Sequence, residues 1–173
     1  MERAGFLRVF EANTGAGEWG AFILSLYGRR LDDNAARCPN TMAVLDRIPD
    51  LCGLVCFSVL APNTHVLPHC GPSNVRLRCH LPVKIPPGCR LRVARRTVEW
   101  TEGESIVFDD SFEHEVWNTS SSPRAVLMFD ILHPDLTAEE RAFCYQVQDL
   151  EAKEQYARTV LENARPPGDW IYG

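Results

Sequence analysis

The middle of the chain has the alternating hydrophobic and polar pattern that is typical of strands in a half-buried sheet. Residues 75–83 are the clearest example, because the odd positions are apolar whereas Arg76, Arg78 and His80 are polar. Successive side chains of a strand point to opposite faces, so these three basic groups are predicted to lie on one face. Such a strand suits a β-barrel or jelly roll whose interior is lined for an anionic ligand.

A continuous apolar run at residues 51–60 predicts a buried strand, and apolar segments bounded by turn residues predict several more strands. These are expected at residues 89–94, 104–108, 112–117 and 124–132. The last two are separated by the turn-rich segment 118–123, so we expect them to form a hairpin. Residues directly opposite one another in a hairpin point the same way, so His114 and Arg124 would share a face if the position numbers of cross-strand partners sum to an even value, which is the register that we predict.

Helices are expected at both ends of this strand-rich region. Residues 18–27 and 41–47 have apolar positions at helix-like spacing, which predicts short helices packed outside a sheet. At the other end, Thr137 to Glu140 has the form of a capping box, and the helix that follows is predicted to reach about residue 164. Pro166-Pro167-Gly168 would stop it, with Trp170 and Tyr172 docking back on the domain.

These elements indicate an α+β fold. We expect a double-stranded β-helix, the cupin-like jelly roll, with flanking N-terminal helices and a C-terminal helix. A chain of 173 residues with 45% hydrophobic content suits one domain over 1–173. The seven cysteines have no CxxC spacing, which argues against a disulfide scaffold and a structural zinc site and favours buried thiols.

Charge and hydropathy narrow the expected partners and location. The net charge of −5 gives no reason to expect nucleic acid or an anionic membrane as a partner, although six arginines between 76 and 96 make that region basic. No stretch approaches the ~20 apolar residues of a membrane helix, and no signal peptide is evident. We therefore expect a cytoplasmic chain as given, or one in the endoplasmic reticulum lumen if it is a fragment of a longer anchored protein.

His69, His114 and Arg124 are the strongest candidates for chemistry. Imidazole is a good ligand for first-row divalent metals, and a guanidinium can grip a carboxylate in bidentate fashion. Together they suit a metal that must hold an organic acid in place, as in iron oxygenases that use 2-oxoglutarate.

The expected third metal ligand is missing from the sequence. Such oxygenases usually place a carboxylate two residues after the first histidine, whereas Gly71 stands there. Asp109 or Asp110 could supply it, but both precede a predicted strand in a turn, so we favour a structural role for them. His65 is another possible ligand, for which we favour a hydrogen-bonding role outside the metal's ligand set.

Two long blocks of sequence surround the histidines. They are His69-Cys70-Gly71-Pro72-Ser73-Asn74-Val75-Arg76-Leu77-Arg78-Cys79-His80 and Phe108-Asp109-Asp110-Ser111-Phe112-Glu113-His114-Glu115-Val116-Trp117-Asn118. Both resemble the aspartyl/asparaginyl β-hydroxylase family. The resemblance runs from about Trp19 to Thr137, which is most of the chain.

The resemblance implies a role for each matching residue. His69 and His114 would bind Fe(II), Arg124 would pair with the distal carboxylate of 2-oxoglutarate, and the remaining positions would contact the co-substrate (Ser58, Arg78, His80) or an acidic substrate side chain (Arg76). The implied reaction consumes O2 and hydroxylates the β-carbon of Asp or Asn in a peptide or protein, such as an epidermal-growth-factor-like domain, with succinate and CO2 as co-products.

Three alternatives stay open. Glycine at the carboxylate position also occurs in 2-oxoglutarate-dependent halogenases, where chloride fills the vacancy. A non-catalytic barrel could bind an acidic ligand through its arginines. A relative of bacterial type could hydroxylate a lipid or small molecule instead of a peptide.

Overall fold

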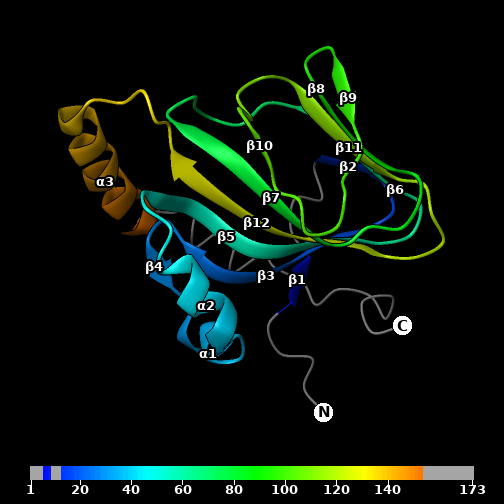
Figure 1. The fold of residues 1–173 in the computed structure, drawn as a ribbon, viewed down its shortest axis with the longest axis horizontal. Coiled ribbons are helices and arrows are strands. Elements are labelled where there is room, and N and C mark those ends of the chain that lie inside the picture. The colour runs from blue at the N-terminus through cyan, green and yellow to red at the C-terminus, as the bar shows by residue number, and fades with distance from the viewer. Residues whose placement is uncertain (1–5, 9–12, 154–173) are drawn as a thin grey trace.

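The protein folds into two antiparallel sheets that face each other, as seen in the computed structural model, which describes residues 6–8 and 13–153 (Figure 1). The larger sheet has the order β1-β3-β5-β12-β7-β10, with β4 beside β3. Its strands are β1 (Phe6–Arg8), β3 (Trp19–Leu26), β4 (Arg29–Arg30), β5 (Leu51–Leu60), β7 (Arg76–Lys84), β10 (Ile106–Phe108) and β12 (Arg124–Leu132). The smaller sheet has the order β2-β6-β11-β8-β9 and contains β2 (Thr14–Ala16), β6 (Thr64–His69), β8 (Cys89–Val93), β9 (Arg96–Val98) and β11 (His114–Asn118).

The main hydrophobic core fills the space between the two sheets. Strands β3, β5 and β12 contribute Ile23, Cys56 and Met128 from one side, and the smaller sheet contributes Val66 and Leu91 from the other. This arrangement of two facing antiparallel sheets confirms the predicted jelly-roll architecture.

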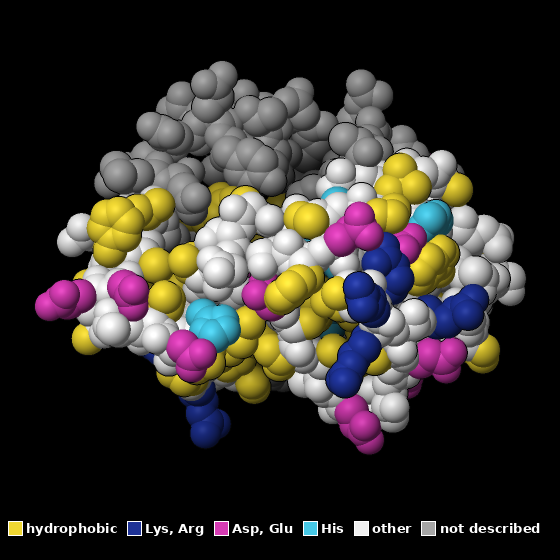
Figure 2. All heavy atoms as spheres, turned by 90° about the horizontal axis from the view of Figure 1, so that it is seen from above, with side chains coloured by type: hydrophobic (Ala, Val, Ile, Leu, Met, Phe, Trp, Pro, Cys, Tyr) yellow, Lys and Arg dark blue, Asp and Glu magenta, His cyan; other side chains and the backbone are white. Residues whose placement is uncertain are grey.

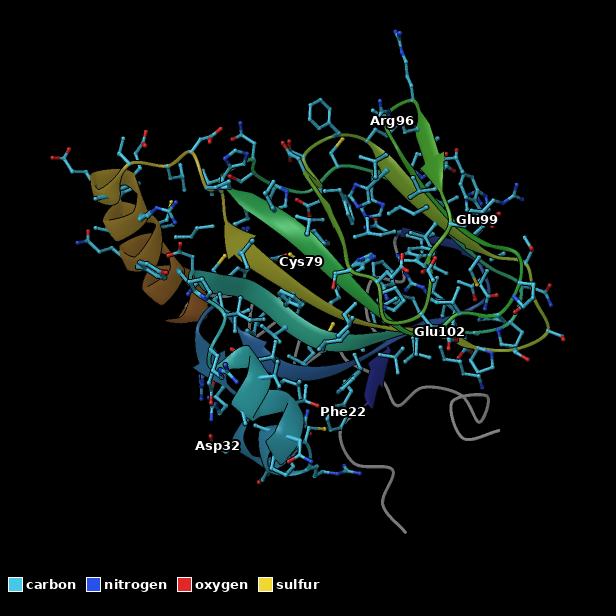
Figure 3. The ribbon with its side chains drawn as sticks, in the orientation of Figure 1. Phe22, Asp32, Cys79, Arg96, Glu99 and Glu102 are labelled. Atoms are coloured by element: carbon cyan, nitrogen blue, oxygen red, sulfur yellow. The ribbon has the colours of Figure 1, made fainter. Side chains whose placement is uncertain are left out.

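A second core lies on the outer face of the larger sheet, under two short helices. The helices are α1 (Asp32–Ala36) and α2 (Pro39–Leu45), and α2 corresponds to the helix predicted at 41–47. Met42 and Leu45 pack with Leu24 and with Phe22, which points to the helix side of the sheet (Figure 3). The helices therefore cover one face of the sheet and leave the other for the interior.

The helix predicted at 18–27 is wrong, because Trp19–Leu26 forms strand β3. This strand pairs with β1 on one side and β5 on the other, and it contributes to both cores. Ile23 faces the interior while Leu24 faces the helices. Since both faces are buried, the sequence has an apolar run without the alternation that would mark a strand.

The hairpin predicted from 112–117 and 124–132 is also wrong. Strand β11 pairs with β6 and β8 in the smaller sheet, whereas β12 pairs with β5 and β7 in the larger one. The segment 119–123 thus crosses from one sheet to the other. His114 and Arg124 do not lie on one face of one sheet; they lie on facing sheets and line the same cavity.

The basic row predicted on residues 75–83 is present in β7. Arg76 and Arg78 line one cavity and His80 lines another, while Leu81 packs against the outer core. Register places Arg78 opposite Asp130 and His80 opposite Met128 of β12. The alternation in the sequence therefore identified the interior face of this strand correctly.

The C-terminal helix α3 (Ala138–Lys153) lies at one end of the larger sheet (Figure 1). Its predicted capping box is confirmed, because Glu140 N–H donates to the Thr137 hydroxyl and the Glu140 carboxylate accepts from Thr137 N–H. Arg141 and Tyr145 fix the helix to Asp50. The predicted extension to about residue 164, the stop at Pro166-Pro167-Gly168 and the docking of Trp170 and Tyr172 lie outside the described residues.

Candidate active site

A bulge in β6 turns His69 toward His114. The two residues are register partners, and the register shifts between His114 and Val116. Leu67 and Pro68 are exposed at this irregularity. A bulge re-aims the side chains that follow it, and the two imidazole centroids lie 4.2 Å apart as a result.

Both histidines are held in the tautomer that a metal site needs. Nδ1 of His69 donates to the Leu67 carbonyl at 2.7 Å, and Nδ1 of His114 donates to the Phe112 carbonyl at 3.0 Å. A carbonyl can only accept a hydrogen bond, so Nδ1 carries a proton in each ring and the neutral form has its lone pair on Nε2. Burial lowers the pKa of His114 to about 4, so this ring is neutral at physiological pH.

The pair fits a metal centre with few protein ligands. Among the residues that the structure describes, no cluster of three or more His, Cys, Asp or Glu side chains is placed to hold a metal ion. A divalent metal on Nε2 of His69 and His114 would keep its other coordination positions for water or small ligands.

Arg124 is a buried cation that lines the same inner cavity as the two histidines. Its side chain is 2% exposed, and Nε and one terminal nitrogen have no hydrogen-bond partner among the described residues. Burial lowers the pKa of Arg124 to about 10, so the group still carries its charge at neutral pH. Because an unpaired buried charge is costly, this guanidinium is a ready site for an anion.

Ser58 and His80 line the inner cavity beside Arg124. The Ser58 hydroxyl accepts a hydrogen bond from Trp19 Nε1 at 2.9 Å. Neither ring nitrogen of His80 has a partner within the described part of the chain. Burial, together with nearby Arg124 and Arg78, lowers the pKa of His80 well below its usual value. A neutral His80 can therefore donate one hydrogen bond and accept another.

Arg78 lies between the inner cavity and an outer one and is held by two carboxylates. Its Nε and a terminal nitrogen donate to Asp130 at 2.9 and 3.2 Å, and the other terminal nitrogen is 3.0 Å from Asp110. Burial alone would lower the pKa of Arg78, but the two carboxylates raise it above its usual value. Unlike Arg124, this arginine already has its counter-ions.

The carboxylate of Asp110 occupies the space beside Gly71. A β-carbon at position 71 would lie 2.4 Å from Asp110 Cγ, and Gly71 N–H donates to the Asp110 carbonyl at 2.6 Å. Burial raises the pKa of Asp110, and Arg78 opposes that shift. Asp109 has the predicted turn role, because its carboxylate accepts from Ser111 N–H at 2.9 Å. A carboxylate from a different segment thus lies directly beside Gly71.

The outer cavity has a volume of about 150 Å³ and opens beside His69. Its lining includes the charged side chains of Arg76 and Arg78 and the apolar side chains of Ile23 and Leu54. The Arg76 guanidinium lies 5.6 Å from the ring centroid of Tyr27. This cavity can accept a molecule that has both an anionic group and an apolar part.

Two further histidines, His65 and His133, lie elsewhere. His65 stacks on Trp117 at 5.2 Å, and its Nε2 contacts Glu115 at 2.9 Å. His133 accepts a hydrogen bond from the Asp135 N–H at 3.2 Å. The His65 contact agrees with the hydrogen-bonding role expected for that residue.

Trp100 packs behind the site residues Arg124 and His80, and sequence reasoning missed it. Its ring lies against Arg124, with the guanidinium carbon 4.3 Å from the ring centroid, and stacks on His80 at 5.9 Å. Trp100 follows β9 in a polar segment without hydrophobic periodicity. No local pattern could have placed it behind the anion site.

The arginines of the basic region differ in their surroundings, and Arg92 is paired with Glu113 and Glu115. Arg76 and Arg78 line the cavities, while Arg90, Arg95 and Arg96 are exposed. Figure 2 shows basic side chains gathered at one end of a face, with acidic side chains among them. Separately, none of the helices in the described residues is long and apolar enough to cross a membrane.

Comparison with known sequences agrees with this geometry. The family model described as aspartyl/asparaginyl beta-hydroxylase matches residues 5–134. Human aspartyl/asparaginyl beta-hydroxylase is 43% identical over 130 residues, which cover 72% of this chain and 17% of that protein. Human aspartate beta-hydroxylase domain-containing protein 2 is 39% identical over 75% of this chain and 37% of its own length.

A bacterial relative and a solved structure extend the comparison. The ornithine lipid ester-linked acyl 2-hydroxylase of Rhizobium tropici is 34% identical over 84% of this chain and 52% of its own length. The structure of a predicted oxalate decarboxylase from Thermotoga maritima has a TM-score of 0.52 at 15% identity, and it covers 75% of this chain and 93% of that one. This structural likeness supports the fold alone.

The chain thus spans between about a sixth and about half of the length of these curated relatives. The match to the family model nevertheless includes both histidines, Arg124 and the strands that carry them. The chain therefore belongs to the aspartyl/asparaginyl β-hydroxylase family.

Proposed function

We propose that this chain is a hydroxylase domain that uses Fe(II), 2-oxoglutarate and O2. His69 and His114 would hold the iron, and Arg124 would bind the distal carboxylate of 2-oxoglutarate. The observation that carries the proposal is the buried, unpaired guanidinium of Arg124 in the cavity that contains two histidines with free Nε2 atoms. A dicarboxylate with a chelating 2-oxo acid end would satisfy both groups at once.

Bound iron and 2-oxoglutarate would supply, with O2, the oxidation that hydroxylates an unactivated carbon and yields succinate and CO2. The chain's own residues position the reactants. Ser58 and neutral His80 offer hydrogen bonds beside Arg124, and Trp19 and Met128 make apolar walls that limit water. Arg78, held by its two carboxylates, lines both this inner cavity and the outer one.

The substrate that we favour is an Asp or Asn side chain of a peptide or protein, hydroxylated at the β-carbon. Arg76 lines the outer cavity next to His69, where it can pair with an acidic side chain. The names of the human relatives support this substrate class. An epidermal-growth-factor-like domain is the first substrate to test.

A lipid is the second candidate substrate. The bacterial relative is named as an acyl hydroxylase, and Ile23, Leu26 and Leu54 are apolar residues in the lining of the outer cavity. An acyl chain could lie against these residues with an anionic group at Arg76. Both candidates use the same proposed iron site and differ only in the outer cavity.

The proposal is tested by measuring succinate formation with Fe(II), 2-oxoglutarate and O2 in the presence of each substrate class. Peptides that contain Asp or Asn are paired with controls that carry Ala at the same position, and acyl lipids are assayed separately. The product should gain one oxygen atom by mass spectrometry, and His114→Ala should abolish the gain. An oxidised acyl chain with unmodified peptides would replace the peptide proposal with the lipid one.

The halogenase alternative and the non-catalytic alternative are tested in the same assay. A halogenated product formed only with chloride would indicate a halogenase. Failure of the native chain to bind Fe(II) or to form succinate with any substrate would leave an anion-binding barrel as the better description.

A further inference from the structure

Trp100 lies behind the guanidinium of Arg124, in the segment between β9 and β10. Its side chain is buried in the core between the sheets and is 6% exposed. The Arg124 guanidinium carbon is 4.3 Å from the ring centroid, well inside the range of a cation–π contact. Trp100 is not among the residues that line the inner cavity, so Arg124 lies between the ring and the ligand space.

The two buried arginines of the interior are stabilised in different ways. Arg78 forms ion pairs with Asp110 and Asp130. Arg124 has no ion pair with any carboxylate of the described residues, and the flat face of Trp100 lies against it instead. An acidic partner would neutralise the guanidinium, whereas the negative face of an aromatic ring attracts the cation and leaves its net charge intact.

We propose that Trp100 is a positioning residue for Arg124, which holds the guanidinium plane and keeps its charge available for the distal carboxylate of a dicarboxylic co-substrate. This inference rests on the proposed function, because it takes 2-oxoglutarate as the ligand. Trp100 acts through Arg124 and does not touch the co-substrate. Its contribution should therefore appear only with ligands that carry a distal carboxylate.

The test is calorimetry under anaerobic conditions with Fe(II) and two ligands. 2-Oxopentanoate shares the 2-oxo acid end of 2-oxoglutarate and has a methyl group in place of the distal carboxylate. Trp100→Leu should weaken 2-oxoglutarate binding about tenfold, which is 1.4 kcal/mol, and should leave 2-oxopentanoate binding unchanged. Trp100→Phe keeps an aromatic face and should stay within about threefold of the native affinity.

Two controls separate positioning from general damage to the fold. Trp117→Leu removes a tryptophan that stacks on His65 outside the cavities, and it should leave the affinity for 2-oxoglutarate unchanged. Trp100→Leu should also have no further effect in an Arg124→Met background, because the residue through which it acts is then absent. If Trp100→Leu does not fold, Trp100→Met replaces it in both comparisons.

The inference would be overturned if Trp100→Leu weakened the binding of both ligands equally. It would also be overturned if Trp100→Leu caused the same tenfold loss of 2-oxoglutarate affinity in the Arg124→Met background. Trp100 would then be an ordinary core residue. Native affinity in Trp100→Leu would also overturn the inference. A native chain that binds no 2-oxoglutarate in the presence of Fe(II) would overturn the proposed function, and the inference with it. A failure of the positioning role alone is therefore distinguishable from a failure of the site.

Discussion

Gly71 has no room for a side chain while Asp110 keeps its position. A β-carbon there would be 2.4 Å from Asp110 Cγ and 2.5 Å from each carboxylate oxygen. We therefore predict that Gly71→Ala lowers the free energy of unfolding by about 1–3 kcal/mol, as overpacking usually does. Urea denaturation of native and variant protein measures this cost.

Asp110→Ala provides the matched background for that prediction, because it removes the atoms with which the new β-carbon would collide. The cost of Gly71→Ala should be clearly smaller in this background, which makes the two changes non-additive. An equal cost in both backgrounds would mean that Asp110 does not fill the space beside Gly71.

His80 should make the stability of the protein depend on pH. Its folded pKa is lowered by burial, so below about pH 6.5 the unfolded chain binds a proton that the folded chain does not. The free energy of unfolding therefore falls as the pH drops. The contribution of His80 should approach about 1.4 kcal/mol per pH unit, the value for one proton.

The measurement is denaturant unfolding of native protein and His80→Gln between pH 7.5 and about 5, without metal or 2-oxoglutarate. The variant should show the smaller slope, and the difference between the two proteins isolates His80 from other titrating groups. Identical slopes would show that folded His80 takes up a proton as readily as unfolded His80 does.

Individual residues of the site differ in how far sequence could identify them. His69, His114 and Arg124 were found because their residue types suit a metal and a carboxylate, and the cavity brings them together. Sequence could not show that Asp110 fills the space beside Gly71, because the Asp110 carboxylate pairs with Arg78, which is distant in the sequence. Trp100 carries no local signal at all, since its contact with Arg124 is purely tertiary.

At the scale of elements, Asn118 fixes the crossing from β11 to β12. It is completely buried, and its Nδ2 donates to the carbonyls of Leu60, Ala61 and Ser122 at 3.3, 2.8 and 2.9 Å. We predict that Asn118→Ala lowers the free energy of unfolding by about 2–4 kcal/mol, because buried carbonyls lose their donor. Ser121→Ala changes an exposed neighbour and should cost less than about 0.5 kcal/mol.

Thermal or urea unfolding of both variants measures this difference, and similar costs would show that the crossing does not depend on Asn118.

The burial of Asn118 also bears on glycosylation, because Asn118-Thr119-Ser120 is a sequon. Its amide nitrogen is engaged inside the fold, so the folded domain should not be glycosylated at Asn118.

The two elements that sequence predicted wrongly have physical explanations. Strand β3 faces a core on both sides, so its run of apolar residues lacks the alternation of a half-buried strand. The segment 119–123 has the composition of a hairpin turn, but it crosses between the sheets. Asn118, at the end of β11, donates hydrogen bonds to the carbonyls of Leu60 in β5 and of Ala61, which follows β5. Short-range pattern cannot distinguish a turn within a sheet from a crossing between two.

At the scale of the whole molecule, the accessibility of the seven cysteines shows which parts of the chain the fold buries. All seven are free thiols, with Cys70 exposed and Cys52, Cys56, Cys79 and Cys89 buried. Burial raises the pKa of Cys56 to about 12, so this thiol is both inaccessible and protonated. We predict that a thiol reagent labels native protein first at Cys70 and labels the four buried cysteines only after unfolding.

Mass spectrometry of protein labelled with and without denaturant locates the modified cysteines. Rapid labelling of Cys56 in native protein would contradict the packing of the sheets.

The layered architecture behind this prediction could be inferred from the alternation in β7 and from the apolar run of β5, which correspond to the strands predicted at residues 75–83 and 51–60. The pairing of strands into two sheets could not, because it depends on contacts distant in sequence.

The central claim is that one cavity holds both a metal, on His69 and His114, and a dicarboxylate, on Arg124. Anaerobic calorimetry of 2-oxoglutarate binding, with and without Fe(II), tests it without knowledge of the substrate. Native protein should bind 2-oxoglutarate only with Fe(II), and His114→Ala should lose that binding. Arg124→Ala should weaken it by more than the tenfold expected for Trp100→Leu and leave only the affinity of the 2-oxo acid end for iron. Native protein without iron-dependent binding, or variants that bind as well as native protein, would contradict the account.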